Sequence, residues 1–204
     1  MRRRYKRRPI PRGPFPLSRI VKLRYMSNQI DLTCTSGALA STNVVANQPV
    51  YLGNYPYGWD QWTALYNHYV VLGSKITVYQ FGQDDSAGSK VFGFVGVYLG
   101  DDATNYTDYT TLIENRMGRF CRATSDSSLS KVTQFYSAKK FFNLKDVKDN
   151  VTRVGSSVSG TPAELANFKI WAQPLNKTSS QTFYCNFMVE WIVMFNERKD
   201  VPAS

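Results

Sequence analysis

The sequence predicts an all-β fold: a single eight-stranded antiparallel jelly roll, preceded by a disordered basic N-terminal arm. Two observations lead to this prediction. The 204 residues include 13 Tyr and 12 Phe, and residues of this kind favour strands. About eight apolar segments with the two-residue period of a strand also follow one another across long loops, without the regular strand–helix rhythm of a parallel sheet. The loops are too long for an immunoglobulin-like sandwich, and the Cys…Trp…Cys arrangement is absent.

Residues 1–18 are basic and rich in proline. Pro9, Pro11, Pro14 and Pro16 interrupt both helices and strand ladders, and the like charges between them repel one another. We therefore divide the chain into a basic nucleic-acid-binding arm, residues 1–18, and a jelly-roll domain, residues 19–204.

The excess of positive over negative charge lies entirely near the N-terminus of the chain. The chain has 25 Lys and Arg against 15 Asp and Glu, a net charge of +10. Ten of those cations and no acid fall in residues 1–24, so 25 less 10 leaves 15 cations to balance the 15 acids of residues 25–204. A neutral body with a cationic end is typical of a protein that binds nucleic acid through that end.

Eleven residues are the candidate nucleic-acid contacts. Cations neutralise phosphates and release their counterions, while arginine and tyrosine also stack on exposed bases. A solubilising tail is the alternative, but it does not explain so dense a cluster. The candidates are Arg2, Arg3, Arg4, Tyr5, Lys6, Arg7, Arg8, Arg12, Arg19, Lys22 and Arg24. Six of them also form the pattern of a nuclear localisation signal, which predicts nuclear import factors as partners: Arg2, Arg3, Arg4, Lys6, Arg7 and Arg8.

The first predicted strand spans residues 20–25. Apolar Val21, Leu23 and Tyr25 alternate with Lys22 and Arg24, so one face packs on the core and the other is cationic. We expect the cationic face to continue the nucleic-acid surface; basic residues that protect an edge strand are the alternative. A second short alternation covers residues 30–34.

A helix is predicted at 58–68, where Trp59, Trp62, Leu65 and Tyr66 have helical spacing. The only histidine, His68, lies at its end, and we expect it to be hydrogen-bonded rather than catalytic.

Two strands follow this helix. The first spans residues 69–81, and its pattern places Val70, Leu72, Ile76 and Val78 on one face. The strand at 91–99 is apolar on both faces and contains glycine, which indicates that it is buried on both sides or closely approached by another backbone.

The second half of the chain contains weaker strand patterns and one strong one. Residues 101–117 are predicted to be a loop with a helical turn at 110–114, and residues 146–162 a connection. Shorter strands are predicted at 120–124, 132–142 and 168–172. Between residues 183 and 195 every second residue is large and apolar or cysteine, which predicts a long strand.

Residues 59–78, with the sequence WDQWTALYNHYVVLGSKITV, resemble capsid proteins of circovirus-like viruses, whose genomes are small, circular and single-stranded DNA. The order of an Arg-rich N-terminus, this tryptophan-rich segment and a late aromatic strand is also similar, although the arm is shorter than is typical. The resemblance implies a jelly roll and an icosahedral T=1 shell of 60 copies of this chain. It also implies packaging of the viral DNA and a final location in the virion. The basic run at residues 2–8 adds the expectation of assembly in the host nucleus.

Other classes of function find little support in the sequence. No nucleophile, P-loop or metal-binding motif is present, so we predict no enzyme activity, catalytic residue, metal site or cofactor. Cys34, Cys121 and Cys185 lie too far apart in sequence for a zinc motif, and no apolar run is long enough to cross a membrane. Two rival hypotheses remain: the coat protein of a small or satellite RNA virus, and a non-viral β-rich nucleic-acid-binding module.

Overall fold

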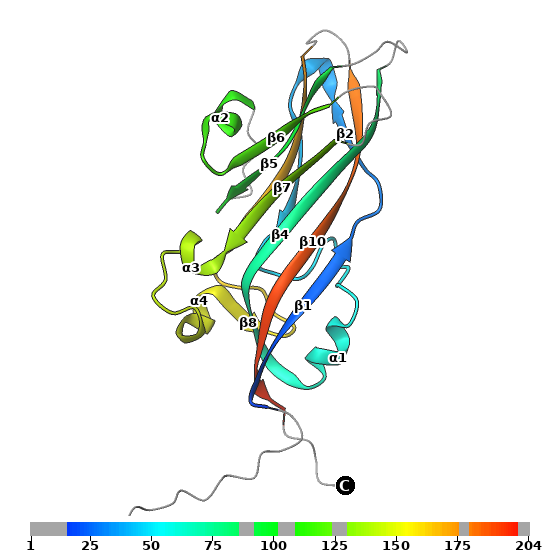
Figure 1. Ribbon diagram of the computed structural model, residues 1–204. Helices are drawn as coiled ribbons and strands as arrows, with labels where there is room; N and C mark the ends of the chain where they lie inside the picture. Colours follow the sequence, from blue (N-terminus) through cyan, green and yellow to red (C-terminus); the bar gives the residue numbers. More distant parts are fainter. Residues whose placement is uncertain (1–15, 86–91, 102–108, 124–129, 176–179, 200–204) are drawn as a thin grey trace, which may run out of the picture.

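The computed structural model describes residues 16–85, 92–101, 109–123, 130–175 and 180–199. Two antiparallel sheets pack face to face (Figure 1). Sheet A has the order β1-β10-β4-β7, with β2 also paired to β10 and β8 to β4. Its strands are β1 (Ser18–Met26), β2 (Ile30–Cys34), β4 (Tyr66–Asp85), β7 (Ser130–Ser137), β8 (Gly155–Ser157) and β10 (Gln181–Arg198). Sheet B has the order β3-β9-β5-β6, with β3 (Ala40–Val45), β5 (Gly93–Gly100), β6 (Gly118–Ala123) and β9 (Asn167–Pro174).

The ten described strands occupy eight positions. β1 and β2 pair with successive parts of β10, so they form one interrupted strand. β8 pairs only with residues 68–70 of β4. Each sheet therefore has four positions, and the predicted eight-stranded jelly roll is confirmed.

Short helices lie in the connections. They are α1 (Trp59–Thr63), α2 (Tyr109–Glu114), α3 (Ala138–Phe141) and α4 (Val151–Val154), with 3₁₀ turns η1 (Thr35–Gly37) and η2 (Lys148–Asn150). The predicted helical turn at 110–114 is α2. No helix within the described part of the chain has the length and apolar character needed to cross a membrane.

The core lies between the sheets and is dominated by β10. All seven alternate residues from 183 to 195 are fully buried, as the strand pattern predicts: Phe183, Cys185, Phe187, Val189, Trp191, Val193 and Phe195. Since the side-chain period of a strand is two, the residues between them point to the outer face of sheet A.

The close approach predicted around the glycines of β5 is also confirmed. A Cβ atom on Gly96 would lie 2.3 Å from the ring of Trp171, and one on Gly93 would lie 2.6 Å from the carbonyl oxygen of Gln173. Only glycine lets β9 and its tryptophan pack this closely on β5.

The predicted helix at 58–68 is too long. The helix ends at Thr63, and β4 begins at Tyr66. Tyr66 and His68 pair with Arg198 and Asn196 of β10, so the sheet ladder takes backbone groups that a longer helix would have used.

The predicted face of β4 is partly wrong. Val71 pairs with Val193 and Gly73 pairs with Ile192, which leaves Leu72 as an extra bulged residue. The bulge reverses the alternation, so Val71 shares the core-facing side with Ile76 and Val78, while Val70 points to the opposite side.

Three further differences concern short elements. The strand predicted at 132–142 ends at Ser137, because residues 138–141 form α3. The connection predicted at 146–162 contains η2, α4 and β8. β3 escaped prediction because its sequence, ASTNVV, is half polar and has no clear alternation.

Candidate nucleic-acid interface

Three of the eleven predicted nucleic-acid contacts lie within the described residues, all on β1: Arg19, Lys22 and Arg24. The other eight lie outside the described residues, in the part of the chain that precedes residue 16: Arg2, Arg3, Arg4, Tyr5, Lys6, Arg7, Arg8 and Arg12. The proposed nuclear localisation signal is also among these.

The described chain begins at the edge of sheet A. The Tyr66 hydroxyl donates a hydrogen bond to the carbonyl oxygen of Pro16 at 3.0 Å, and β1 then pairs with β10 from Ser18 onward. Because Tyr66 is fully buried, this bond fastens the entry point of the chain to the start of β4. The basic sequence 1–15 therefore joins the fold beside β1.

Lys22 and Arg24 lie on the outer face of sheet A, as the alternation predicted. Leu23 between them is buried, whereas the Lys22 and Arg24 side chains are 60% and 63% exposed. Arg19 is exposed too, but pairs with core-facing Phe195 and so belongs to the other side of the strand. The structure brings together Lys22 and Arg24 and leaves Arg19 apart.

Both residues bind a carboxylate that the sequence analysis did not identify as part of the site. Lys22 Nζ and Arg24 Nη2 each lie 2.8 Å from Glu190 Oε1 on β10. Lys75 Nζ of β4 lies 2.6 Å from Glu190 Oε2. We call these four residues, Lys22, Arg24, Lys75 and Glu190, the charge cluster. Its members come from three adjacent strands of sheet A.

The electrostatics of the charge cluster favour an ionised Glu190. Its side chain is only 6% exposed, yet hydrogen bonds from Lys22, Lys75 and Arg24 lower its pKa from 4.5 to about 2, which outweighs the opposing effect of burial. One carboxylate between three cations leaves the charge cluster with a net charge of about +2. The exposed cations keep N–H donors that can bind a phosphate.

Glu190 and Lys75 were missed because neither belongs to a cluster of charges in the sequence, and each acquires its role only from its neighbours in the sheet. Glu190 is 166 residues from Arg24 in sequence. The alternation of β10 places Glu190 on the side opposite its core-facing residues, but only the pairing of β1 with β10 brings it to the face that carries Lys22 and Arg24.

Other parts of the described chain show no competing chemistry. His68 Nδ1 lies 2.6 Å from Glu197 Oε2, in agreement with the prediction of a hydrogen-bonded histidine. The thiols of Cys34 and Cys185 are buried, and burial raises their pKa values to about 11 and about 12. Within the described residues, no group of three His, Cys, Asp or Glu is placed to hold a metal ion.

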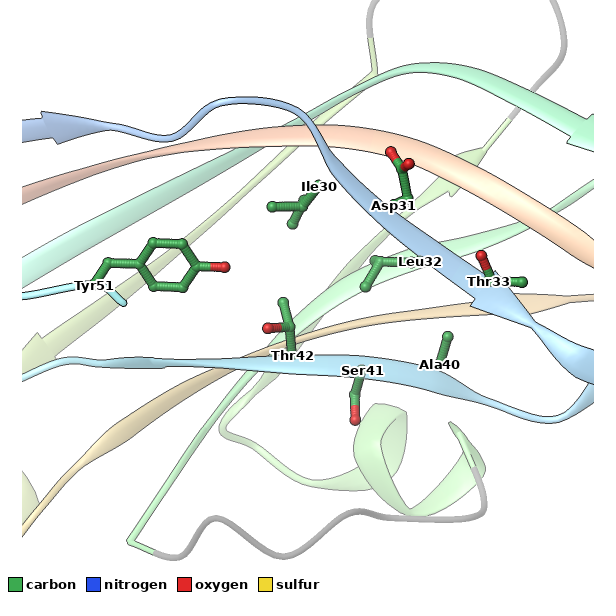
Figure 2. A pocket seen from close by; sticks show the side chains of 8 residues that line it. All are labelled: Ile30, Asp31, Leu32, Thr33, Ala40, Ser41, Thr42 and Tyr51. Atoms are coloured by element: carbon green, nitrogen blue, oxygen red, sulfur yellow. The ribbon is translucent and has the colours of Figure 1, made fainter. Parts of the chain in front are cut away.

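A cavity of about 540 Å³ opens between β2 and β3, where the edges of the two sheets approach each other. Figure 2 shows Ile30 and Leu32 of β2 facing Thr42 of β3, with the Tyr51 hydroxyl pointing into the space. The only charged residue in its lining, Asp31, points away. The cavity therefore offers neither cations for phosphate nor paired groups for acid–base chemistry.

The fold is similar to solved structures of viral coats. The structure of mud crab tombus-like virus matches with a TM-score of 0.51 and 10% identity, over 91% of this chain and 92% of that chain. The semi-empty virus-like particle of Macrobrachium rosenbergii nodavirus, from the giant freshwater prawn, matches with a TM-score of 0.51 and 11% identity. This match covers 94% of this chain and 100% of that chain. The 60-mer capsid protein of the circovirus BFDV matches with a TM-score of 0.48 and 12% identity, over 93% and 100%. No protein-family model and no curated protein matches the chain. The chain thus has the jelly-roll fold of viral capsid proteins.

Proposed function

We propose that this chain is a viral capsid protein that assembles with copies of itself into a small icosahedral shell and packages the viral genome through its basic arm. The observation that carries the proposal is the division of charge along a jelly-roll chain. All ten excess cations lie in residues 1–24, and the remaining 180 residues carry equal numbers of acids and bases. Neutral bodies pack edge to edge without mutual repulsion, while the arms neutralise phosphates.

The position of the arm supports this proposal. The arm joins the fold at the edge of sheet A, at the start of the strand that carries Lys22 and Arg24. Arm and sheet face would together form one cationic surface, which we assign to the inside of the shell. The eleven predicted contacts, from Arg2 to Arg24, are the residues proposed to bind the genome.

The finer assignment is a circovirus-like shell of 60 copies around circular single-stranded DNA. It rests on the sequence resemblance over residues 59–78, a segment that spans α1 and the first part of β4. Trp59 and Trp62 pack there against Phe195 of β10, with ring centroids 5.4 and 6.0 Å apart. Import by nuclear import factors through Arg2–Arg8 and assembly in the host nucleus belong to the same proposal.

An RNA genome is the second candidate. Two of the similar solved structures, each with a TM-score of 0.51, are a tombus-like virus and a nodavirus, and the nodavirus coat is that of an RNA virus. Arginine contacts the same phosphates in both nucleic acids. Treating the nucleic acid extracted from purified particles with DNase and, separately, with RNase distinguishes the two genomes.

Removal of residues 1–18 tests the role of the arm. We expect the shortened protein to form shells that lack nucleic acid, because the body keeps its packing surfaces while the net charge of +10 falls by the seven cations of residues 1–18. The ratio of absorbance at 260 and 280 nm, with electron microscopy of the same sample, measures both properties. Shells that still package nucleic acid at the full-length level would contradict the assigned role of the arm.

A further inference from the structure

The outer face of sheet A carries aromatic and apolar side chains as well as the charge cluster. Phe135 of β7 is 64% exposed, Met26 of β1 49% and Phe81 of β4 45%. No described helix crosses the middle of β1, β10 and β4 on the side seen in Figure 1. The face therefore combines exposed rings with exposed cations.

The corresponding face of sheet B is different. On β9, Lys169 and Trp171 alternate with the core-facing residues Phe168, Ile170 and Ala172, yet both are buried, at 1% and 0% exposure. The outer face of sheet B is therefore covered within the subunit at β9. Its exposed ring, Phe120 at 47%, lies on β6, whereas the exposed side chains of sheet A lie on β1, β4 and β7.

A hollow of about 440 Å³ lies on the outer face of sheet A. Its lining residues come from three neighbouring strands: Met26, Tyr79, Phe81, Asn186 and Met188. The bulge that inserts Phe81 between residues paired with Tyr184 and Cys185 produces the wall of the hollow. A flat ring can enter such a space between an aromatic wall and methionine side chains.

Asn186, which lines the hollow, carries an unsatisfied polar group beneath its surface. The Oδ1 atom of Asn186 is buried and accepts no hydrogen bond from any described residue. A purely apolar occupant would leave this amide unpaired, at a cost in free energy. A nucleobase has both a stacking face and an edge with donors and acceptors, and can satisfy the amide.

Two of the three aromatic residues on this face are placed beside a cation. Tyr79 pairs across the ladder with Lys131, and Phe135 pairs with Lys75. Directly paired residues of neighbouring strands have Cβ atoms about 5 Å apart. A base stacked on either ring would therefore have a lysine within reach of its phosphate.

We propose that the outer face of sheet A binds unpaired nucleotides, with one base in the hollow beside Asn186, another on Phe135, and their phosphates on Lys131 and Lys75. The inference rests on the proposed nucleic-acid binding but adds a second surface to the arm, with different chemistry. The arm attracts any polyanion, whereas this face selects single strands, since stacking needs bases that are not already paired.

The net positive charge of the outer face of sheet A favours a polyanion as its binding partner. Among the described side chains of this face, the four cations Lys22, Arg24, Lys75 and Lys131 outnumber the two carboxylates, Glu190 and Asp31. The cationic arm of the same chain would be repelled. A second copy packed on this face about a two-fold axis would place cations against cations.

Ultraviolet cross-linking tests the inference in the full-length chain. Unassembled protein is mixed with a DNA strand, an RNA strand of the same sequence, or the DNA duplex, then assembled, irradiated and digested for peptide mass spectrometry. We expect nucleotide adducts on peptides that contain Tyr79, Phe81 and Phe135 with both single strands and not with the duplex. Adducts confined to residues 1–18 would overturn this inference and leave the proposed role of the arm intact, and the absence of all adducts would overturn both.

A pair of variants measures the contribution of stacking. In 0.5 M NaCl, which screens the arm, F81A/F135A should bind the single strands about tenfold more weakly than the unaltered chain. The matched control, F92A/F120A, removes two exposed rings from the sheet B side and should bind normally. Equal affinities of the two variants would overturn the inference, as would protein–protein cross-links between two copies at residues 79–81, which would show a neighbouring subunit on this face.

Discussion

At the residue scale, the side chain that organises the candidate interface is Glu190. It holds Lys22 and Arg24 of β1 and Lys75 of β4 within 2.8 Å of its oxygens, on a face of the sheet that no described helix covers. Without it, three cations would lie side by side and repel one another. Glu190 therefore makes a dense cationic surface compatible with a stable sheet.

The low pKa of Glu190 predicts how stability depends on pH. Its folded pKa, about 2, is below its ordinary value of 4.5, so the carboxylate contributes stability above pH 4.5 that is lost as the pH falls toward 2. We expect Glu190→Gln to lower the free energy of unfolding by about 1–2 kcal/mol at pH 7, since the exposed cations are screened by solvent.

Chemical denaturation of both proteins at several pH values measures this difference. The difference in free energy of unfolding between the original protein and Glu190→Gln should shrink below pH 4.5 and be largely lost by pH 2. Lys131→Gln, which removes an exposed cation with no ion pair among the described residues, is the matched control. A constant difference from pH 7 to pH 2 would show that the charge of Glu190 does not stabilise the sheet.

The orientation of Lys22 and Arg24 could be predicted from the sequence, but their ion-pair partner, Glu190, could not. Strict alternation around Leu23 was enough to place both cations on the outer face. The carboxylate that binds them is contributed by a strand at the other end of the chain, and pairing between distant strands leaves no local signal. The aromatic residues of the same face, such as Phe135, were indistinguishable in sequence from core residues.

At the scale of elements, the long strands were predictable where their alternation was unbroken. β10 keeps one face buried from Phe183 to Phe195, and its pattern was therefore clear. β4 has about the same length, but the bulge at Leu72 changes the face midway and misled the assignment of Val70. A second bulge, at Phe81, forms a wall of the hollow on the outer face. The two-residue period of a regular strand predicts neither bulge, so the shape of this face could not be predicted from the sequence.

The packing of β5 against β9 gives a prediction for Gly96. A methyl group there would lie 2.3 Å from the Trp171 ring, so Gly96→Ala should lower the free energy of unfolding by about 1–3 kcal/mol. Thermal unfolding of the single variant, and of G96A combined with W171L, measures this. The second substitution should recover part of the loss, and a single variant as stable as the original would contradict the packing described.

At the scale of the whole molecule, the proposed shell limits how much nucleic acid the protein can neutralise. In a shell of 60 copies, the ten cations of residues 1–24 supply about 600 positive charges, and the 204-codon gene alone takes about 612 nucleotides, each with one phosphate. A genome that also encodes a replication protein must therefore be balanced partly by mobile cations or polyamines.

Elemental and polyamine analysis of purified particles tests this balance. We expect more phosphorus than Lys and Arg charges of the arms, with the difference made up by magnesium, potassium or polyamines. A genome much longer than about 612 nucleotides, neutralised by protein alone, would contradict the charge account.

Negative-stain electron microscopy of the purified full-length protein, with its mass in solution, is the most direct test of the central claim that this jelly roll builds a shell. The account predicts closed particles of uniform diameter and about 60 copies, the simplest icosahedral number. A population of single chains of 23.2 kDa at every protein and salt concentration would contradict it, and would favour a monomeric nucleic-acid-binding module.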